Sequence, residues 1–258
     1  MLITRRDTLK FGLAGAAGLG ATIVMPYRAA AQMKEGDSYA TDSGAIGIFP
    51  IAHASFVMTI PGMTIYNDPV GEASAYEGHP RPDVILVTHE HGDHYNADTL
   101  AAITGDNTVI VTNPAVHRML PDALKSKATA IGNGESHSIG DLTIDAIPAY
   151  NITEGRLQYH PKGRDNGYVL TIDERRVYIA GDTEDIPEMR ALSDIYIAFV
   201  PMNLPYTMDV NQAGSAVAEF APAFVYPYHY RGSDLDQFAA AVAAGGGEAE
   251  IVEGNWYG

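Results

Sequence analysis

Cysteine is absent from the 258-residue chain. The protein therefore has no disulfide, no thiolate nucleophile and no thiolate metal ligand, and any metal ion must be held by histidine, carboxylate or neutral oxygen atoms. Basic residues are also scarce, because 16 Lys and Arg stand against 32 Asp and Glu, which gives a formal net charge of −16. A chain this acidic is poorly suited to grip nucleic acid. We therefore expect a small-molecule substrate and no nucleic-acid partner.

Long apolar runs are missing too, apart from one segment near the N-terminus. "FGLAGAAGLGATIVM" at 11–25 follows the pair Arg5 and Arg6, and an Ala-x-Ala site ending at Ala31 comes after it. The segment is too short and too rich in glycine for a stable membrane span, and its flanks are typical of a secretory signal. The paired arginines resemble a twin-arginine (Tat) signal. We predict that residues 1–31 are a signal peptide, removed after the export machinery has delivered the chain to the periplasm or beyond. An ordinary basic helix is the alternative.

Residues 32–258 show no internal repeat and no long low-complexity tract, so we interpret them as one domain. Short runs rich in β-branched and aromatic residues recur, and most are apolar through several successive positions, as in strands buried on both faces. The early runs follow one another directly, whereas later runs alternate with predicted helices at about 96–103, 114–120, 187–192, 210–220 and 233–244. Asp209 and Gln212 form a capping pattern at the start of the fourth helix. This order predicts two packed sheets with helices on their outer faces.

The stretch "VTHEHGDHY" gathers three histidines and two acids directly after a predicted buried strand. His89 and His91 are two residues apart and can point at one cation, while Gly92 allows a tight turn that sends Asp93 and His94 towards a second. Neutral imidazoles and a carboxylate suit zinc, with iron or manganese as alternatives. Chance clustering in a polar turn is the competing interpretation. Without a bound cation, however, nothing would offset the conformational entropy lost when these side chains are ordered.

The His-x-His-x-Asp-His pattern resembles the hallmark of the metallo-β-lactamase superfamily. The resemblance implies an αββα sandwich, which is two packed β-sheets with helices on the outer faces, and a site along one edge that usually holds two metal ions. It also implies that a bridging aspartate and a last histidine follow at later strand ends. "RVYIAGDTED" places Asp182 at the first of these positions, and "FVYPYHYRG" places His229 at the second. A turn-forming aspartate and a satisfied strand-end histidine are the alternatives.

One position departs from the superfamily pattern, because "AIPAYN" has Asn151 where most relatives carry a further metal-binding histidine. Asparagine is a poor zinc ligand. Nine residues later "QYHPKGRDN" offers His160, and this combination resembles a lactonase- and phosphodiesterase-like branch of the superfamily. His160 is our candidate for the missing ligand, against a substrate-facing or surface role. Lys162 and Arg164 beside it could meet an anionic group of the substrate or simply be solvated.

Other histidines and one aspartate carry weaker signals. His53 in "IAHASFVM" and Asp68 in "YNDPV" come from early strands. Each could hydrogen-bond a ligand, or could serve only packing or a turn. His79, His117 and His137 lie in polar stretches, and we expect them at the surface.

Together these residues predict an exported metal-dependent hydrolase. Two divalent ions would be held by seven side chains: His89, His91, Asp93, His94, His160, Asp182 and His229. The ions would lower the pKa of a bridging water, and the hydroxide would attack an ester-type bond of the lactone or phosphodiester class. Asp93 would orient the water and Asp182 would bridge the ions. A serine mechanism is not indicated, since the chain has no Gly-x-Ser-x-Gly elbow.

Two other functions are compatible with the same ligands. A mononuclear iron oxidoreductase on this fold would need two histidines and one carboxylate. A periplasmic metal-binding or interaction protein would bind metal without catalysis. The sequence does not indicate the oligomeric state.

Overall fold

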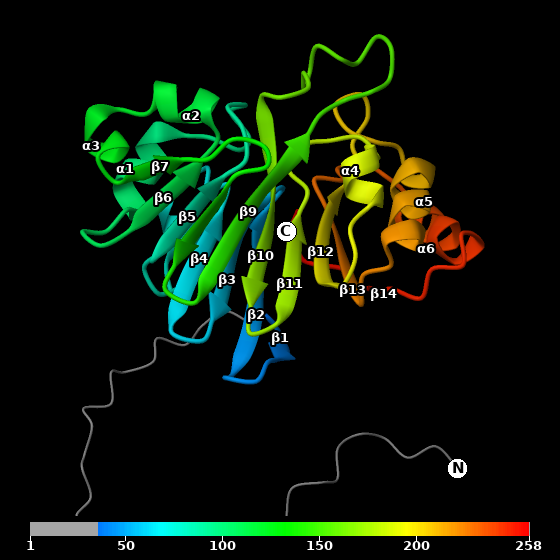
Figure 1. The fold of residues 1–258 in the computed structure, drawn as a ribbon, viewed down its shortest axis with the longest axis horizontal. Coiled ribbons are helices and arrows are strands. Elements are labelled where there is room, and N and C mark those ends of the chain that lie inside the picture. The colour runs from blue at the N-terminus through cyan, green and yellow to red at the C-terminus, as the bar shows by residue number, and fades with distance from the viewer. Residues whose placement is uncertain (1–35, 258) are drawn as a thin grey trace, which may run out of the picture. The chain divides into compact units, whose positions relative to one another are not determined.

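Two β-sheets of seven strands each pack face to face in the computed structural model, which describes residues 36–257 (Figure 1). The first sheet follows the chain in order: β1 (Asp37–Ala40), β2 (Ala45–Ala52), β3 (Ser55–Ile60), β4 (Met63–Asn67), β5 (Val84–Val87), β6 (Val109–Thr112) and β7 (Ala128–Ala130). The second sheet has neighbouring strands in sequence order as well: β8 (Ser136–Ile139), β9 (Leu142–Ala149), β10 (Asp165–Ile172), β11 (Arg175–Ile179), β12 (Ile195–Pro201), β13 (Phe224–Tyr228) and β14 (Glu250–Ile251).

Each sheet is half antiparallel and half parallel. Strands β1 to β4 and β8 to β11 pair as antiparallel neighbours, whereas β4 to β7 and β11 to β14 pair as parallel neighbours. Helical connections cover the outer faces: the short 3₁₀ helix η1 (Ala73–Tyr76), α1 (Ala97–Ile103), α2 (Pro114–Met119), α3 (Asp122–Lys125), α4 (Pro187–Arg190), α5 (Val210–Phe220) and α6 (Leu235–Ala244). The expected αββα sandwich is confirmed.

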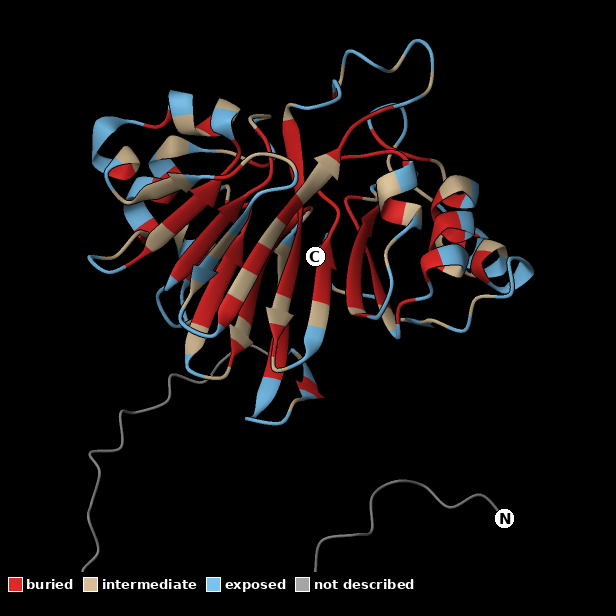
Figure 2. Cartoon of the chain, viewed as in Figure 1, coloured by how far each residue is buried: buried red, intermediate tan, exposed pale blue. Residues whose placement is uncertain are grey.

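The main core lies between the two sheets and is rich in aromatic rings. Phe56 of the first sheet stacks on Phe199 of the second with 4.2 Å between ring centroids. Tyr226 also stacks on Phe199, with 5.0 Å between centroids. Trp256 packs edge-on against both Phe56 and Phe199. The strands in the middle of the molecule are buried along most of their length (Figure 2). Burial on both faces explains why the strand sequences are apolar at successive positions.

The five predicted helices are present, with ends within two residues of the expected bounds. Asp209 caps α5 by accepting hydrogen bonds from the backbone of Asn211 and Gln212, and the Gln212 side chain accepts from the Asp209 backbone. The capping prediction is therefore confirmed. None of the helices in residues 36–257 is long and apolar enough to cross a membrane. The proposed signal peptide lies outside the described residues and stays a prediction.

The parallel halves of the sheets bring several strand ends to one edge of the sandwich. Strand β5 of the first sheet and strands β11 and β13 of the second all run towards this edge, and polar residues follow each of them. The long connection between β9 and β10 rises above the same edge in Figure 1. Carboxyl ends of parallel strands are where open sheets place their sites.

Buried tyrosines make the fold sensitive to alkali. Burial raises the pKa of Tyr39, Tyr66 and Tyr76 to about 12 each. Tyrosine in an unfolded chain titrates near pH 10. Because the folded-state pKa is the higher one, the stabilising contribution of the neutral phenols is complete below pH 10 and is lost as the pH rises towards 12. We predict that the melting temperature falls over this interval. A pH titration of phenolate absorbance should show these groups ionising only as tertiary structure disappears, whereas ionisation of every tyrosine near pH 10 in a folded protein would contradict the prediction.

Candidate metal centre

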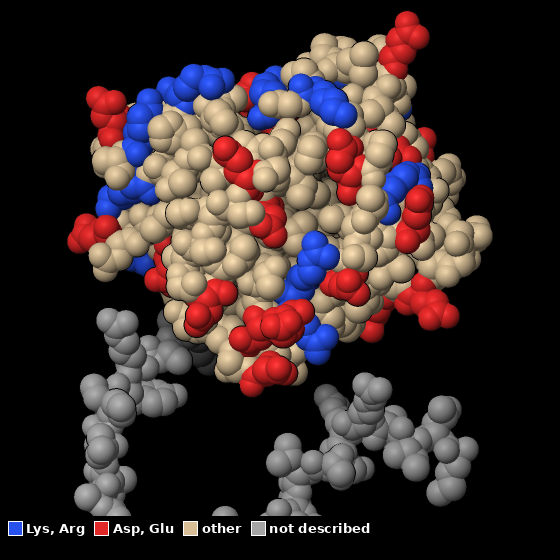
Figure 3. All heavy atoms as spheres, viewed as in Figure 1, with Lys and Arg blue, Asp and Glu red and all other residues tan. Residues whose placement is uncertain are grey.

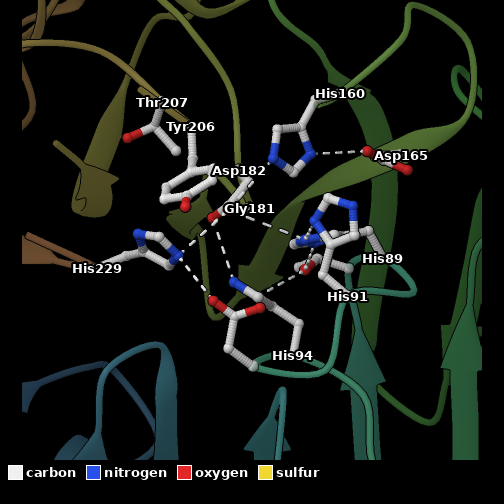
Figure 4. A network of polar contacts seen from close by, with 12 residues as sticks. His89, His91, His94, His160, Asp165, Gly181, Asp182, Tyr206, Thr207 and His229 are labelled. Carbon is white, nitrogen blue, oxygen red and sulfur yellow. Dashed lines mark hydrogen bonds and ion pairs between the residues drawn. The ribbon is translucent and has the colours of Figure 1, made fainter. Parts of the chain in front are cut away.

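Three strand ends meet around the carboxylate of Asp182. His89 comes two residues after β5, Asp182 comes three residues after β11, and His229 directly follows β13. Gly181 gives the turn before Asp182 a left-handed backbone with φ of +64°. Five imidazoles surround the carboxylate in Figure 4, with the ring of Tyr206 beside them. The structure thus brings together side chains that are up to 140 positions apart in the sequence, since His89 and His229 both approach Asp182.

A first group of possible ligands contains three histidines and Asp182. The donor atoms of His89, His91, His160 and Asp182 all lie within 4.8 Å of one another. His89 Nε2 is 3.1 Å from His91 Nδ1 and 3.9 Å from Asp182 Oδ2. Burial lowers the pKa of His89 well below its ordinary value, so its imidazole is neutral, which is the form that binds metal.

A second group shares the same aspartate and contains His94 and His229. His94 Nε2 is 3.3 Å from Asp182 Oδ1, and His229 Nε2 is 3.2 Å from Asp182 Oδ2. The two oxygens of one carboxylate therefore face different histidines. Because Asp182 Oδ2 also faces His89 and His160 of the first group, the carboxylate lies between the two groups of possible ligands.

A third group contains His53, Asp93 and His229. His53 Nε2 is 3.2 Å and His229 Nε2 is 3.4 Å from Asp93 Oδ2. Burial disfavours the ionised form of Asp93, but its hydrogen bonds with His229 and His53 outweigh this and hold its pKa well below its ordinary value. The open role of His53 is thereby decided in favour of the site.

Tyr257 determines which nitrogen of His53 carries the proton. The Tyr257 hydroxyl accepts backbone N–H bonds from Tyr230 and Arg231 at 2.9 and 3.0 Å. Its own proton is then free to be donated to His53 Nδ1, which is 3.0 Å away. His53 must in that case carry its proton on Nε2 and donate it to Asp93. The C-terminal segment thus fixes the orientation of a site carboxylate.

Residues behind the histidines hold them in place. Asp68 Oδ2 lies 2.8 Å from His94 Nδ1, and the same carboxylate accepts from the backbone and hydroxyl of Thr88 at 2.7 Å each. Asp165 Oδ2 lies 2.9 Å from His160 Nδ1, and Arg164 binds Asp165 through two nitrogens. Carboxylates that orient ligand imidazoles in this way are typical of metal centres. Asp68 therefore supports a site histidine.

Opposite charges balance across the buried cluster. Burial disfavours the ionised form of Asp182, but the neighbouring histidines, led by His229 and His94, hold its pKa well below its ordinary value. Burial also disfavours the imidazolium of His94, yet the carboxylates of Asp182 and Asp68 raise its pKa well above the usual value. The Asp182 carboxylate thus stays ionised and attracts positive charge.

Unpartnered polar atoms show that these side chains fit a cation. Five buried atoms of the cluster make no hydrogen bond within residues 36–257: His94 Nε2, His160 Nε2, His229 Nδ1 and Nε2, and Asp182 Oδ1. Leaving a buried polar group unpaired costs about 1–3 kcal/mol. The contacts of 3.2, 3.3 and 3.4 Å to Asp182 also match the distance of about 3.3 Å between ligand atoms that share a tetrahedral ion with bonds of about 2.0–2.1 Å.

His160 lies beside Asp182, and Asn151 does not contact the cluster through its amide. The Nε2 of His160 is 3.4 Å from Asp182 Oδ2, whereas the Asn151 amide is turned away and donates to the carbonyls of Arg156 and Tyr206. Burial opposes protonation of His160, but the neighbouring carboxylates of Asp165 and Asp182 raise its pKa to about 9. The backbone N–H of Asn151 also donates to the His160 carbonyl at 2.8 Å. The asparagine therefore anchors the loop that delivers the histidine.

A cavity of about 440 Å³ opens onto this cluster. It is lined by cluster residues and by four side chains that the sequence analysis did not single out: Tyr159, Asn203, Tyr206 and Arg231. No spacing signal pointed to them, because they lie on loops. Lys162 and Arg164, the cations expected near a substrate, are paired with Glu188 and Glu90. His79, His117 and His137 lie outside the three groups.

The chain is similar to a family of known domains and to several solved structures. A domain family described as a β-lactamase superfamily domain matches residues 48–229. The UPF0173 metal-dependent hydrolase of Methanopyrus kandleri is 28% identical over 225 residues, which cover 78% of this chain and 94% of the relative. The corresponding protein of Pyrococcus horikoshii is 30% identical over 181 residues, which cover 66% of this chain and 77% of the relative.

Among solved structures, a candidate metal-dependent hydrolase from Parabacteroides distasonis superposes with a TM-score of 0.77 and 42% identity, covering 85% of this chain and 97% of the other. The metallo hydrolase Igni18 from Ignicoccus hospitalis superposes with a TM-score of 0.66 and 21% identity, covering 81% and 95%. This second similarity shows a shared fold.

Gly181 should be irreplaceable in the turn that presents Asp182. A Cβ at this position would lie 2.7 Å from the Asn166 carbonyl oxygen, in addition to the strain of a positive φ. Gly62 has a φ of +76° and open space around it, so Gly62→Ala is a matched control that adds strain alone. We predict a loss of about 1 kcal/mol of unfolding free energy for Gly62→Ala. Gly181→Ala should cost a further ~1–3 kcal/mol and should lower the bound metal per chain. Urea unfolding measures the loss of stability, and elemental analysis measures the bound metal. Equal stability and equal metal content of the two variants would show that the close approach of the Asn166 carbonyl does not matter.

Proposed function

Because the chain belongs to the metal-dependent hydrolase (UPF0173) family of the metallo-β-lactamase superfamily, we propose that it hydrolyses an ester-type bond of the lactone or phosphodiester class with two divalent metal ions. The observation that carries the proposal is the position of Asp182. It contacts His160 of one group and His94 and His229 of another, and it belongs to two of the three groups of possible ligands.

Each ion would have its own ligands and would share Asp182. We assign His89, His91 and His160 to one ion, and Asp93, His94 and His229 to the other. Imidazole and carboxylate donors without thiolate suit zinc, iron or manganese. When bound, such ions supply Lewis-acid chemistry: they make water acidic enough to react at neutral pH and stabilise negative charge on the attacked group.

The side chains of the protein would orient the reactants and handle the proton. Asp93 is half exposed and lines the cavity, so its carboxylate can orient a water molecule and take its proton. His53 holds Asp93 Oδ2 from the other side. Asp182 is almost completely buried, which keeps bulk water from its contacts with the histidines.

The mononuclear iron oxidoreductase is the less economical alternative. It needs two histidines and one carboxylate, whereas six histidines and two carboxylates make up the three groups in the described part of the chain. Elemental analysis of protein purified without added metal separates the two functions. About one redox-active iron per chain would contradict the hydrolase with two ions.

Asp93→Ala should abolish most of the hydrolysis. We predict that the wild-type protein, loaded with zinc or manganese, turns over members of a panel of lactones and phosphodiesters, and that Asp93→Ala lowers kcat at least roughly 100-fold because the group that orients water is gone. Asp106→Ala is the control, since Asp106 is exposed and far from the three groups. Turnover that survives in Asp93→Ala, or a wild-type protein inactive on every member, would count against the proposed function.

His160→Ala tests the ligand that replaces the missing histidine. We predict that metal affinity falls about tenfold or more, with fewer ions retained per chain after gel filtration. Competition with a chelator gives the affinity, and elemental analysis gives the number of ions. His117→Ala is the control, because His117 lies on α2 outside the cluster. An unchanged metal content in His160→Ala would exclude this histidine as a ligand.

A further inference from the structure

Arg231 is a cation at the cavity that has no anionic partner among the described residues. It is exposed, lines the cavity together with Asp93 and Asp182, and has its guanidinium 5.6 Å from the centre of the Tyr257 ring. No carboxylate of residues 36–257 lies within ion-pairing distance of it. In a chain with a net charge of −16, an arginine at a cavity is expected to attract an anion.

The neighbouring cations are already neutralised by carboxylates. Lys162 Nζ lies 3.4 Å from Glu188, Arg164 lies 3.1 Å from Glu90, and Arg156 lies 3.0 Å from Glu184. These pairs show what the protein does with basic side chains around the site. Arg231 differs from them, and its charge is available to a ligand.

Exposed apolar side chains lie on two loops that contribute Tyr159 and Tyr206 to the lining of the same cavity. Residues 36–257 contain six large apolar side chains classed as exposed, and four of them lie in segments 151–160 and 203–207. We call these four the apolar collar: Ile152 (47% exposed), Leu157 (48%), Leu204 (51%) and Tyr206 (45%). The protruding connection between β9 and β10 is covered mainly by uncharged side chains in Figure 3. Grouped apolar exposure of this kind marks a binding surface in soluble proteins.

Hydrogen bonds hold the two loops of the collar together. The Asn151 amide donates to the Tyr206 carbonyl at 2.8 Å, and Arg156 donates to the Thr207 carbonyl at 3.1 Å. The rings of Tyr159 and Tyr206, which both line the cavity, are 5.1 Å apart and edge-on. Hydrogen bonds and ring contacts therefore fix the two loops to each other, and Tyr206 connects the collar to the cavity.

The first loop is also anchored to the body of the protein. The buried Glu184 carboxylate accepts the backbone N–H groups of Ile152 and Thr153 at 2.8 and 2.7 Å. Such anchoring keeps Ile152 exposed, although burying it would be favourable. A ligand that covers the collar would recover that free energy.

We propose that the substrate is an anionic amphiphile: a phosphodiester that carries an alkyl or acyl chain. Its negative charge meets Arg231 and its chain lies on the apolar collar. The inference rests on the proposed function, and it selects the phosphodiester because a lactone would leave Arg231 without a counter-charge. In the reaction, water adds to phosphorus, the bond from phosphorus to the leaving alcohol oxygen breaks, and a proton of the water ends on that oxygen. The products are a phosphomonoester and an alcohol.

Binding of a homologous series of alkylphosphonates to the metal-loaded protein tests both parts of the inference. We predict that affinity, measured by calorimetry, increases from ethyl- through butyl- and hexyl- to octylphosphonate, by up to about fourfold for each methylene that the collar covers. Leu204→Ser should flatten this increase and leave ethylphosphonate binding unchanged. Met119→Ser is the matched control, because Met119 is 53% exposed but lies on α2.

Arg231→Met tests the charge. We predict that it weakens all four phosphonates by about tenfold, because each loses one charge-assisted hydrogen bond, whereas Arg118→Met on α2 has no effect. Chain-length-independent binding, or full affinity in Arg231→Met, would overturn the inference. So would sedimentation showing a dimer that Leu204→Ser dissociates, since a second copy of the chain would then cover the collar. The turnover panel tests the proposed function separately. If a short-chain ester is hydrolysed as fast as a long-chain one, the inference is overturned, but the protein is still a hydrolase.

Discussion

Burial of the Asp182 carboxylate is the constraint on which the arrangement of the site depends. An ionised carboxylate is costly to bury unless positive or hydrogen-bonding partners surround it. His89 and His94 approach it from the first sheet, and His160 and His229 approach it from the second. Both sheets must therefore be folded and packed before the carboxylate is satisfied. Metal binding and the stability of the edge between the sheets are coupled for this reason.

The site divides into a buried half and an exposed half with different physical properties. Histidines and carboxylates at the strand ends are held by buried partners such as Asp68 and Asp165, so their geometry is set by the sheets. Arg231 and the apolar collar lie on loops at the mouth of the cavity. Most candidate ligands are thus held by buried partners near strand ends, whereas the proposed recognition surface lies on loops, as in folds that serve many substrates.

Local signals in the sequence predicted those parts of the fold that depend on neighbouring residues. Asp209 and Gln212 are three positions apart and form their cap within one turn of α5, so the start of that helix was legible. Tyr257 shows the opposite case: it reaches His53, which is 204 positions away, through the folding of the whole chain. No spacing rule connects such residues. The same holds for Arg231. It is a candidate for binding an anionic substrate group because the neighbouring basic side chains are paired with glutamates in the folded structure.

The sequence by itself indicated a metal centre, because His89, His91, Asp93 and His94 lie in one turn whose short spacing keeps their side chains near one another. It also determined the two-sheet architecture through the order of apolar runs and helices. Only the tertiary structure showed that His160 reaches Asp182 while the Asn151 amide binds loop carbonyls, since the loop between β9 and β10 must fold back for the imidazole to do so. It also decided that Lys162 and Arg164 are neutralised while Arg231 is not. Distances between side chains far apart in sequence are set by sheet pairing and loop anchoring. Neither produces a regular spacing of residues that could be recognised in the sequence.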